Sequence, residues 1–259
     1  MHRGRLECRL LGGFELRLDG HPLAVGQPKQ RALLALLALR WDRPVFGDEI
    51  IDAIWDDAPP RGARNQVHVY VRGIRRMLAA AGVRPGIVVT SARGYRLDVP
   101  LGVVDLGVFH HLMANARQLI RAERQSDAAE VTRSALALWQ GRPLGGIDGR
   151  YFERAATALE EQHLVALEQH MRLQMTLGRY AELAVTLRVA LEAHPFHEEL
   201  RYGLMYALYH CGRMIEALEV YREGRTRTVH EFGIEPGHRL QRLERRIVRN
   251  EPVPRSIEA

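Results

Sequence analysis

Arginine and histidine recur at a four-residue spacing that would suit contact with a polyanion. Arg64, His68 and Arg72 fall at positions i, i+4 and i+8, which places them in one row along a helix. Guanidinium groups bind phosphates and the edge of guanine in the major groove of DNA through paired hydrogen bonds. Residues 61–96 hold eight arginines and no acid, so we expect no acidic neighbour to neutralise this row. The chemistry that the row predicts is nucleic-acid binding.

The segment that carries the row, residues 65–78, fits either a strand or a helix. Val67, Val69 and Val71 alternate with polar residues as in a half-buried strand, yet Val67, Val71 and Ile74 also follow helical spacing. The helical spacing of apolar residues continues for about fifteen residues, which is too long for a typical strand. We therefore predict a helix whose valines face the core.

The elements predicted before and after this helix follow the order of a known DNA-binding fold. Residues 6–25 alternate apolar and polar side chains and predict two or three short antiparallel strands. Helices are predicted over 28–40 and 47–55, and residues 87–98 predict a hairpin with Arg93 at its tip. Strands, three helices and a hairpin form a winged helix-turn-helix, which places its third helix in the major groove.

The net charge of +6 lies entirely in this first part of the chain. Residues 1–99 carry 16 basic and 10 acidic side chains, whereas residues 100–259 carry 21 of each. Within the first part, residues 44–60 hold five acids and no base. Phosphates repel acids, so we expect the helix at 47–55 to face away from DNA or towards a basic protein surface.

These patterns predict seven DNA-binding residues. They are Arg64, Asn65, His68, Arg72, Arg75, Arg76 and Arg93. The first four are expected at the major groove, with Asn65 near its entry. The last three are expected to neutralise phosphates, and Arg93 could also enter the minor groove. Tyr70 is assigned to the core.

Catalytic and metal chemistry find little support in the sequence. Lys29 is the only lysine, so a Gly-Lys-Ser/Thr phosphate loop is excluded. Pro195 separates His194 from His197 and breaks the single helical face that a two-histidine zinc motif needs. No nucleophile elbow and no paired carboxylates in a plausible cleft are apparent. We predict no enzyme activity, no catalytic residue, no cofactor and no metal site.

From Asp105 onward the sequence predicts helices only. "GRYAEL" begins at Gly178 and "GRMIEAL" at Gly212, a spacing of 34 residues, which is the tetratricopeptide period. Residues 126–139 have a related pattern, separated from these repeats by an insertion, and the glycine-rich stretch 141–149 predicts a loop. Stacked helix pairs of this kind form concave surfaces that bind proteins or peptides.

The predicted fold is an α+β N-terminal winged helix-turn-helix followed by an all-α tetratricopeptide-like helical domain. We place the first domain at 1–99, the second at 105–250 and a flexible tail at 251–259. The longest uninterrupted apolar run, 32–39, has eight residues, and the first ten residues contain no secretory h-region. We expect a cytoplasmic protein without a membrane association.

Six motifs in this order resemble the Streptomyces antibiotic regulatory protein family over residues 6–249. They are "PKQRALLALLAL", "VHVYVRGIRRML", "LWQGRPLGGI", "GRYAEL", "GRMIEALEVYR" and "EFGIEPGHRLQRLERRI". The resemblance implies an OmpR-type DNA-binding domain joined to a bacterial transcriptional activation domain. It implies a recognition helix at about 61–80 and a polymerase-facing loop at "DDAPP". Gly73 stands where the family commonly has arginine or lysine.

Such a protein would activate transcription, typically of a secondary-metabolite (antibiotic) biosynthetic gene cluster. Its partners would be double-stranded promoter DNA with direct repeats and the RNA polymerase holoenzyme, and two copies could form a head-to-tail homodimer on the repeats. The alternative is a tetratricopeptide-type protein-interaction adaptor whose basic domain docks on an acidic protein. Only the activator should show a preference for particular DNA sequences.

Overall fold

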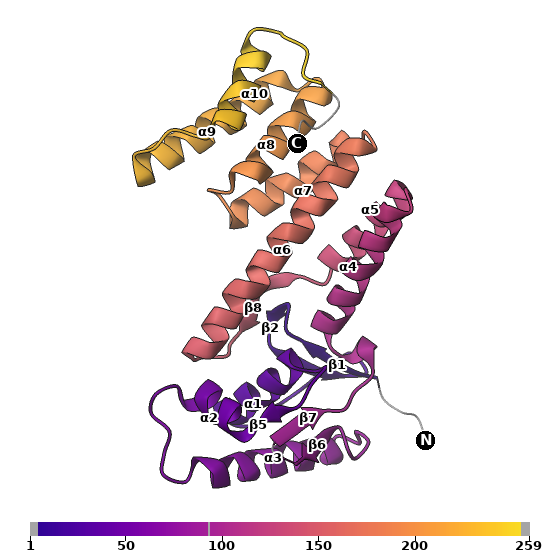
Figure 1. Cartoon of the computed structure of the whole chain (residues 1–259), viewed down its shortest axis with the longest axis vertical. Coiled ribbons are helices and arrows are strands. Elements are labelled where there is room, and N and C mark those ends of the chain that lie inside the picture. Colours follow the sequence, from indigo (N-terminus) through magenta and orange to yellow (C-terminus); the bar gives the residue numbers. More distant parts are fainter. Residues whose placement is uncertain (1–4, 93, 255–259) are drawn as a thin grey trace. The chain divides into compact units, whose positions relative to one another are not determined.

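The computed structural model describes residues 5–92 and 94–254 (Figure 1). Contacts between Cα atoms divide the chain into two compact units. The first comprises Met1–Asn115 and Ser134–Leu164, and the second comprises Ala116–Arg133 and Val165–Ala259.

Four short strands open the first unit. They are β1 (Leu6–Arg9), β2 (Gly12–Gly13), β3 (Glu15–Leu18) and β4 (His21–Leu23). β1, β3 and β4 form an antiparallel sheet, in which Leu6 lies opposite Leu18 and Leu16 opposite Leu23. The predicted antiparallel strands are confirmed.

The helix α1 (Pro28–Leu39) forms much of the core of this unit, because every residue from Ala32 to Ala38 is buried. Pro28 suits the start of the helix, where its missing N–H would have no intrahelical partner. α1 packs against α2 (Gly47–Trp55) and α3 (Ala63–Ala80). All three helices agree with the sequence prediction.

The predicted hairpin consists of β6 (Val88–Ser91) and β7 (Gly94–Leu97), and β5 (Val45–Phe46) pairs with the other edge of β7. A Cβ atom on Gly94 would collide with the backbone of Val45, so the close approach of β5 requires glycine there. Helices and hairpin together complete a winged helix-turn-helix. Arg93 lies outside the described residues.

One strand lies where the sequence predicted a loop among helices. β8 (Gln140–Gly145) pairs in parallel with β2, with Gly12 opposite Gln140 and Gly13 opposite Gly145. A Cβ atom on Gly12 would lie 2.7 Å from the carbonyl oxygen of Gln140, so glycine permits this approach. The prediction of helices only after Asp105 was wrong here, because a glycine-rich strand lacks apolar alternation and its partner is distant in sequence.

The remaining elements are helical. They are the 3-10 helix η1 (Leu101–Val103), α4 (Asp105–Arg121), α5 (Gln125–Leu136), α6 (Arg150–Thr176), α7 (Tyr180–Ala193), α8 (Glu198–His210), α9 (Met214–Phe232) and α10 (His238–Val248). Among residues 5–92 and 94–254, the helices lack the combination of length and apolar character that crossing a membrane requires.

The 34-residue period appears as a repeated way of ending a helix. Gly178 and Gly212 have φ angles of 69° and 76°, in the left-handed region that favours glycine. After each, the N–H of an arginine donates to a carbonyl five residues earlier at 2.9 Å, from Arg179 to Gln174 and from Arg213 to Leu208. α7 and α9 then begin at equivalent positions, which confirms the predicted repeat.

The third, more divergent repeat has the same helix end without glycine. Glu123 has a φ angle of 59°, and the N–H of Arg124 donates to the carbonyl of Leu119 at 2.9 Å before α5 begins. The segment predicted at 126–139 therefore begins with the same backbone turn as the repeats that start at Gly178 and Gly212.

Residues 253 and 254 pack on α8, although the sequence assigned them to a flexible tail. Val253 is buried, and the Tyr206 hydroxyl donates a hydrogen bond to the carbonyl of Pro254 at 3.0 Å. Residues 255–259 of that predicted tail lie outside the described residues.

A buried histidine on α6 predicts a pH dependence of stability. His170 is 3% exposed, and burial, followed by the positive charge of Arg133, lowers its pKa. Glu130 and Glu182 act in the opposite direction. The unfolded chain, with a histidine pKa of about 6.5, takes up a proton before the folded chain does, so the free energy of unfolding should decrease as the pH falls below about 6.5.

Urea unfolding followed by circular dichroism at about pH 7.5 and about pH 5.5 measures this effect. His170→Gln should lose less stability between the two pH values than the wild type. An equal loss in both proteins would show that His170 is not the responsible group.

Candidate nucleic-acid interface

The helix α3 has one apolar face, which packs into the core of the first unit. Val67, Val71, Ile74 and Leu78 are each at most 4% exposed. This settles the strand-or-helix ambiguity of the segment in favour of a helix and confirms the predicted core positions.

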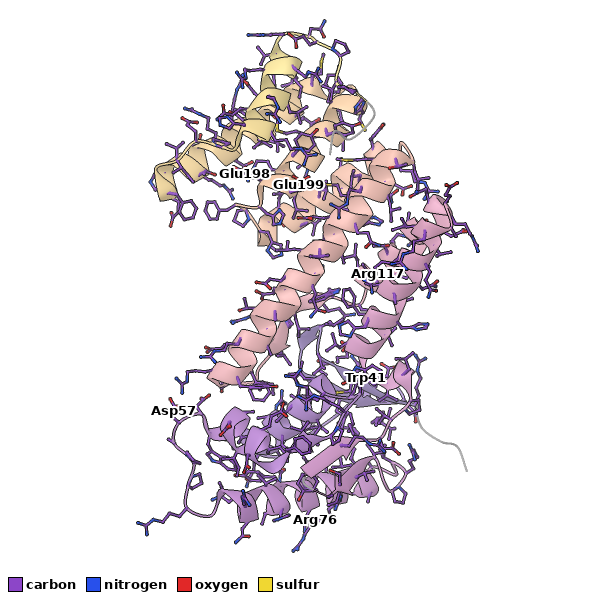
Figure 2. All side chains as sticks on the ribbon, in the orientation of Figure 1. Trp41, Asp57, Arg76, Arg117, Glu198 and Glu199 are labelled. Carbon is purple, nitrogen blue, oxygen red and sulfur yellow. The ribbon has the colours of Figure 1, made fainter. Side chains whose placement is uncertain are left out.

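The opposite face of α3 is formed by Asn65, Val69, Arg72 and Arg76, which are all exposed. At 100° per residue, these four lie roughly opposite the buried row. Arg76 extends away from the helix (Figure 2). Val69 is 60% exposed, so the prediction that the valines face the core was wrong for this one. Val69 lies two residues after Val67, and at 100° per residue this rotates its side chain by about 200° around the helix axis, away from the buried face.

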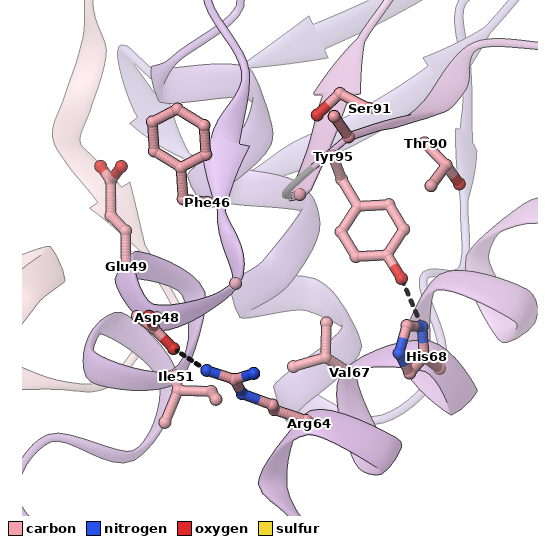
Figure 3. A pocket seen from close by; sticks show the side chains of 13 residues that line it. Phe46, Asp48, Glu49, Ile51, Arg64, Val67, His68, Thr90, Ser91 and Tyr95 are labelled. Carbon is pink, nitrogen blue, oxygen red and sulfur yellow. Dashed lines mark hydrogen bonds and ion pairs between the residues drawn. The ribbon is translucent and has the colours of Figure 1, made fainter.

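Arg64 is paired with an acid, contrary to the expectation that no acidic neighbour neutralises the row. Its Nη2 lies 2.8 Å from Oδ1 of Asp48, which the first turn of α2 brings near (Figure 3). Both side chains are more than three-quarters exposed. Since pairs this exposed contribute only about 0–1 kcal/mol, a phosphate can compete with Asp48 for Arg64.

His68 is connected to the wing by a hydrogen bond. Its Nδ1 lies 2.6 Å from the Tyr95 hydroxyl on β7 (Figure 3). Burial raises the pKa of the Tyr95 hydroxyl, and Arg75 acts in the opposite direction. When the hydroxyl donates to Nδ1, the N–H of the imidazole is at Nε2 and can donate a hydrogen bond in turn.

Arg75 also connects α3 to the wing. Its Nε donates to the carbonyl of Val88 at 3.0 Å, and its Nη2 donates to Oγ1 of Thr90 at 2.8 Å. By contrast, Arg72 and Arg76 have no hydrogen bond or ion pair with any residue of 5–92 and 94–254. The arginines of α3 therefore form two groups. Arg64 and Arg75 bind other residues of the protein, whereas Arg72 and Arg76 point outward.

The acids of residues 44–60 meet basic side chains of the same unit. Glu49 lies 2.9 Å from Arg43, and Asp57, labelled in Figure 2, pairs with Arg150 at the start of α6. The hydrogen bond with Asp57 raises the pKa of Arg150. Arginines of the same unit thus neutralise part of the acidic segment, and the orientation of the helix at 47–55 relative to DNA stays a prediction.

An open groove of about 800 Å³ separates the start of α2 from α3 and the wing (Figure 3). His68, Thr90 and Tyr95 line it, as does Phe46, whose side chain is 49% exposed. The Ser91 hydroxyl, also in its lining, is buried without a hydrogen-bond partner among the described residues. Phosphate oxygens can accept hydrogen bonds from hydroxyl and imidazole N–H groups of this kind.

Gly73 faces α1, where it makes room for a glutamine. A Cβ atom at Gly73 would collide with the amide nitrogen of Gln30. Gln30 also takes part in the capping box at the start of α1, with its Oε1 3.4 Å from the N–H of Gln27. The Gln30 amide is the end of a flexible side chain that could move aside, so this contact favours glycine at position 73 but does not require it.

Tyr70 packs against α2 but is only half-buried, so its assignment to the core is correct only in part. Its ring stacks on Trp55 with centroids 6.0 Å apart, and its hydroxyl lies 3.3 Å from Oε1 of Gln66. In the part of the chain that the structure describes, no group of three or more histidine, cysteine or acidic side chains could hold a metal ion.

Sequence reasoning missed two residues of this surface. Val69 was assigned inward because alternating valines suggest burial, but its helical phase alone, opposite Val67, could have placed it outside. Asp48 could not be paired with Arg64 from the sequence, because the turn between α2 and α3 decides which residues meet.

Two family models match the chain. The model described as "Transcriptional regulatory protein, C terminal" matches residues 22–97, and the "Bacterial transcriptional activator domain" matches residues 104–248. The first match contains α1 to α3 and the wing, and the second contains α4 to α10.

Three relatives are similar over nearly the whole chain. The transcriptional regulatory protein EmbR of Mycobacterium tuberculosis is 36% identical over 96% of this chain, which spans 65% of EmbR. The regulatory protein AfsR of Streptomyces coelicolor is 36% identical over 99% of this chain and 25% of AfsR. The regulatory protein DnrI of Streptomyces peucetius is 30% identical over 95% of this chain and 93% of DnrI.

A solved structure has the same fold. It is Mycobacterium tuberculosis EmbR in complex with a low-affinity phosphopeptide, with a TM-score of 0.84 and 35% identity over 97% of this chain and 67% of that one.

Proposed function

The chain belongs to the Streptomyces antibiotic regulatory protein family, and on that premise we propose that it is a sequence-specific DNA-binding activator of transcription. It would act in the cytoplasm on double-stranded promoter DNA. EmbR, AfsR and DnrI are all named as regulators, and the two matched models both describe transcriptional regulation.

The observation that carries the proposal is the outward face of α3 beside the wing. Arg72 and Arg76 are exposed and bound to no other residue of the described chain. The wing lies along the flank of the same helix, where His68 and Arg75 bind it. A helix with free arginines fits the major groove, which is about 12 Å wide, while a wing can reach the backbone. Asn65 shares this outward face, and Arg64, His68 and Arg75 would border the contact. Arg93 is proposed as a further phosphate or minor-groove contact.

We assign DNA binding to residues 1–99 and activation to residues 105–250. The proposed target is the promoter of a secondary-metabolite gene cluster, in which direct repeats would bind two copies head to tail. The activation domain would then recruit RNA polymerase holoenzyme, and its tetratricopeptide-like helix pairs are of a type that binds proteins.

Sequencing of the genomic DNA fragments that co-purify with the full chain tests the proposal. We expect enrichment of a small set of promoter fragments that share a repeated motif. In gel shifts, the chain should bind these fragments more tightly than random-sequence DNA of equal length, and its affinity should decrease steeply with salt.

Equal affinity for enriched and random fragments would refute sequence-specific binding. It would favour the adaptor alternative, in which the basic domain docks on an acidic protein.

A further inference from the structure

Val69 is an exposed apolar residue on a helix whose other valines are buried. Its side chain is 60% exposed, whereas Val67 and Val71 are 3% and 2% exposed. Single exposed apolar residues are common on protein surfaces, so exposure alone needs no explanation. Valine is also a poorer helix former than alanine, so folding of α3 gives no reason for valine at this position.

Val69 lies among polar and basic residues on the outward face of α3. Asn65 lies one turn before it and Arg72 one turn after it on the outward face of α3, and Arg76 follows. This row is the part of α3 farthest from the buried face. If α3 inserts into a groove, Asn65, Val69 and Arg72 would contact the bottom of that groove together.

The basic residues beside this row are already engaged within the protein. Arg64 pairs with Asp48, His68 with Tyr95, and Arg75 with the wing. They are therefore positioned at the flank of α3 that faces α2 and the wing. The central row is left with one amide, one apolar side chain and two arginines that bind no residue of 5–92 and 94–254.

This composition matches the chemistry of the major groove. Arginine recognises guanine and asparagine recognises adenine through paired hydrogen bonds, and the 5-methyl group of thymine is the apolar feature of the groove. We infer that Val69 is a specificity-determining residue that contacts a thymine methyl group, next to the base that Arg72 contacts. This inference rests on the proposed function, because it requires that α3 enters the major groove.

Replacing thymines by deoxyuridine, which lacks only the methyl group, tests the contact. The probe is a double-stranded oligonucleotide with the enriched site, in which each thymine is replaced in turn. For the wild type, one replacement in each half-site should weaken binding roughly fourfold, as expected for loss of one buried methyl group. Val69→Ala should weaken binding of the unmodified site by a similar factor and become insensitive to that replacement.

Val248→Ala is a matched control, because Val248 is also 60% exposed and ends α10. It should keep the wild-type response to every replacement. If the wild type prefers the site but no replacement distinguishes it from Val69→Ala, the inference is overturned and the proposed function stands. If the wild type shows no preference for any DNA sequence, the proposed function fails and the inference fails with it.

Discussion

Arg72→Ala is expected to weaken binding to the specific DNA site by about 5- to 150-fold while changing the affinity for random DNA much less. The range follows from the roughly 1–3 kcal/mol of discrimination that one bidentate arginine–base contact supplies. We expect Arg72 to contact a base directly, because it is exposed on the outward face of α3 and no described residue binds its guanidinium group.

Arg75→Ala should behave differently. Its guanidinium group is bound to Val88 and Thr90, so it lies at the wing and is expected to contact phosphate. Its replacement should weaken specific and random DNA alike and reduce the slope of log affinity against log salt by about one.

Fluorescence anisotropy with specific and random oligonucleotides over a series of salt concentrations separates the two effects. Arg242→Ala, which removes one exposed positive charge from α10, controls for net charge. An Arg72→Ala protein with the same ratio of specific to random affinity as the wild type would exclude Arg72 from base recognition.

Asp105→Ala is expected to lower the free energy of unfolding by about 3 kcal/mol. The carboxylate at the start of α4 accepts hydrogen bonds of 2.9 Å and 3.0 Å from the N–H groups of Leu10 and Leu11, and another from Leu106. Leu10 and Leu11 are at most 1% exposed. Without the carboxylate, each of their N–H groups loses a partner at about 1–3 kcal/mol, and α4 loses a group that satisfies its first turn.

Burial raises the pKa of Asp105, and the three backbone donors oppose this shift. Asp105→Asn keeps an acceptor oxygen and should lose clearly less stability than Asp105→Ala. Asp98→Ala is the control, because Asp98 pairs with Arg96 at an exposed site, where a pair contributes about 0–1 kcal/mol. Urea unfolding measures all three variants. A similar loss in Asp105→Ala and Asp98→Ala would contradict the structural role of Asp105.

Regular elements with strong local signals could be predicted from the sequence. The apolar spacing of α3 and the alternation in β1 and β3 each depend on residues close together in the chain. The 34-residue period is visible because two short motifs recur at a fixed spacing. The strand β8 has no such signal, because it becomes a strand only through its pairing with Gly12 and Gly13.

The candidate site shows the same division. The outward positions of Asn65, Arg72 and Arg76 follow from helical phase, which the sequence contains. The engagement of Arg64 by Asp48 depends on how α2 meets α3, and the approach of Gln30 to Gly73 depends on the contact between α1 and α3. Such contacts between elements are decided by packing, which no local pattern records.

The pairing of β2 with β8 constrains how this chain could exchange its DNA-binding part by recombination. A recombination that moved residues 1–99 alone into a new gene would leave the backbone of Gly12 and Gly13 without the partner that residues 140–145 supply. It would also separate Asp57 from Arg150. A new DNA specificity is therefore best inherited as a larger block that carries β8 and the start of α6, or through substitutions confined to the outward row of α3.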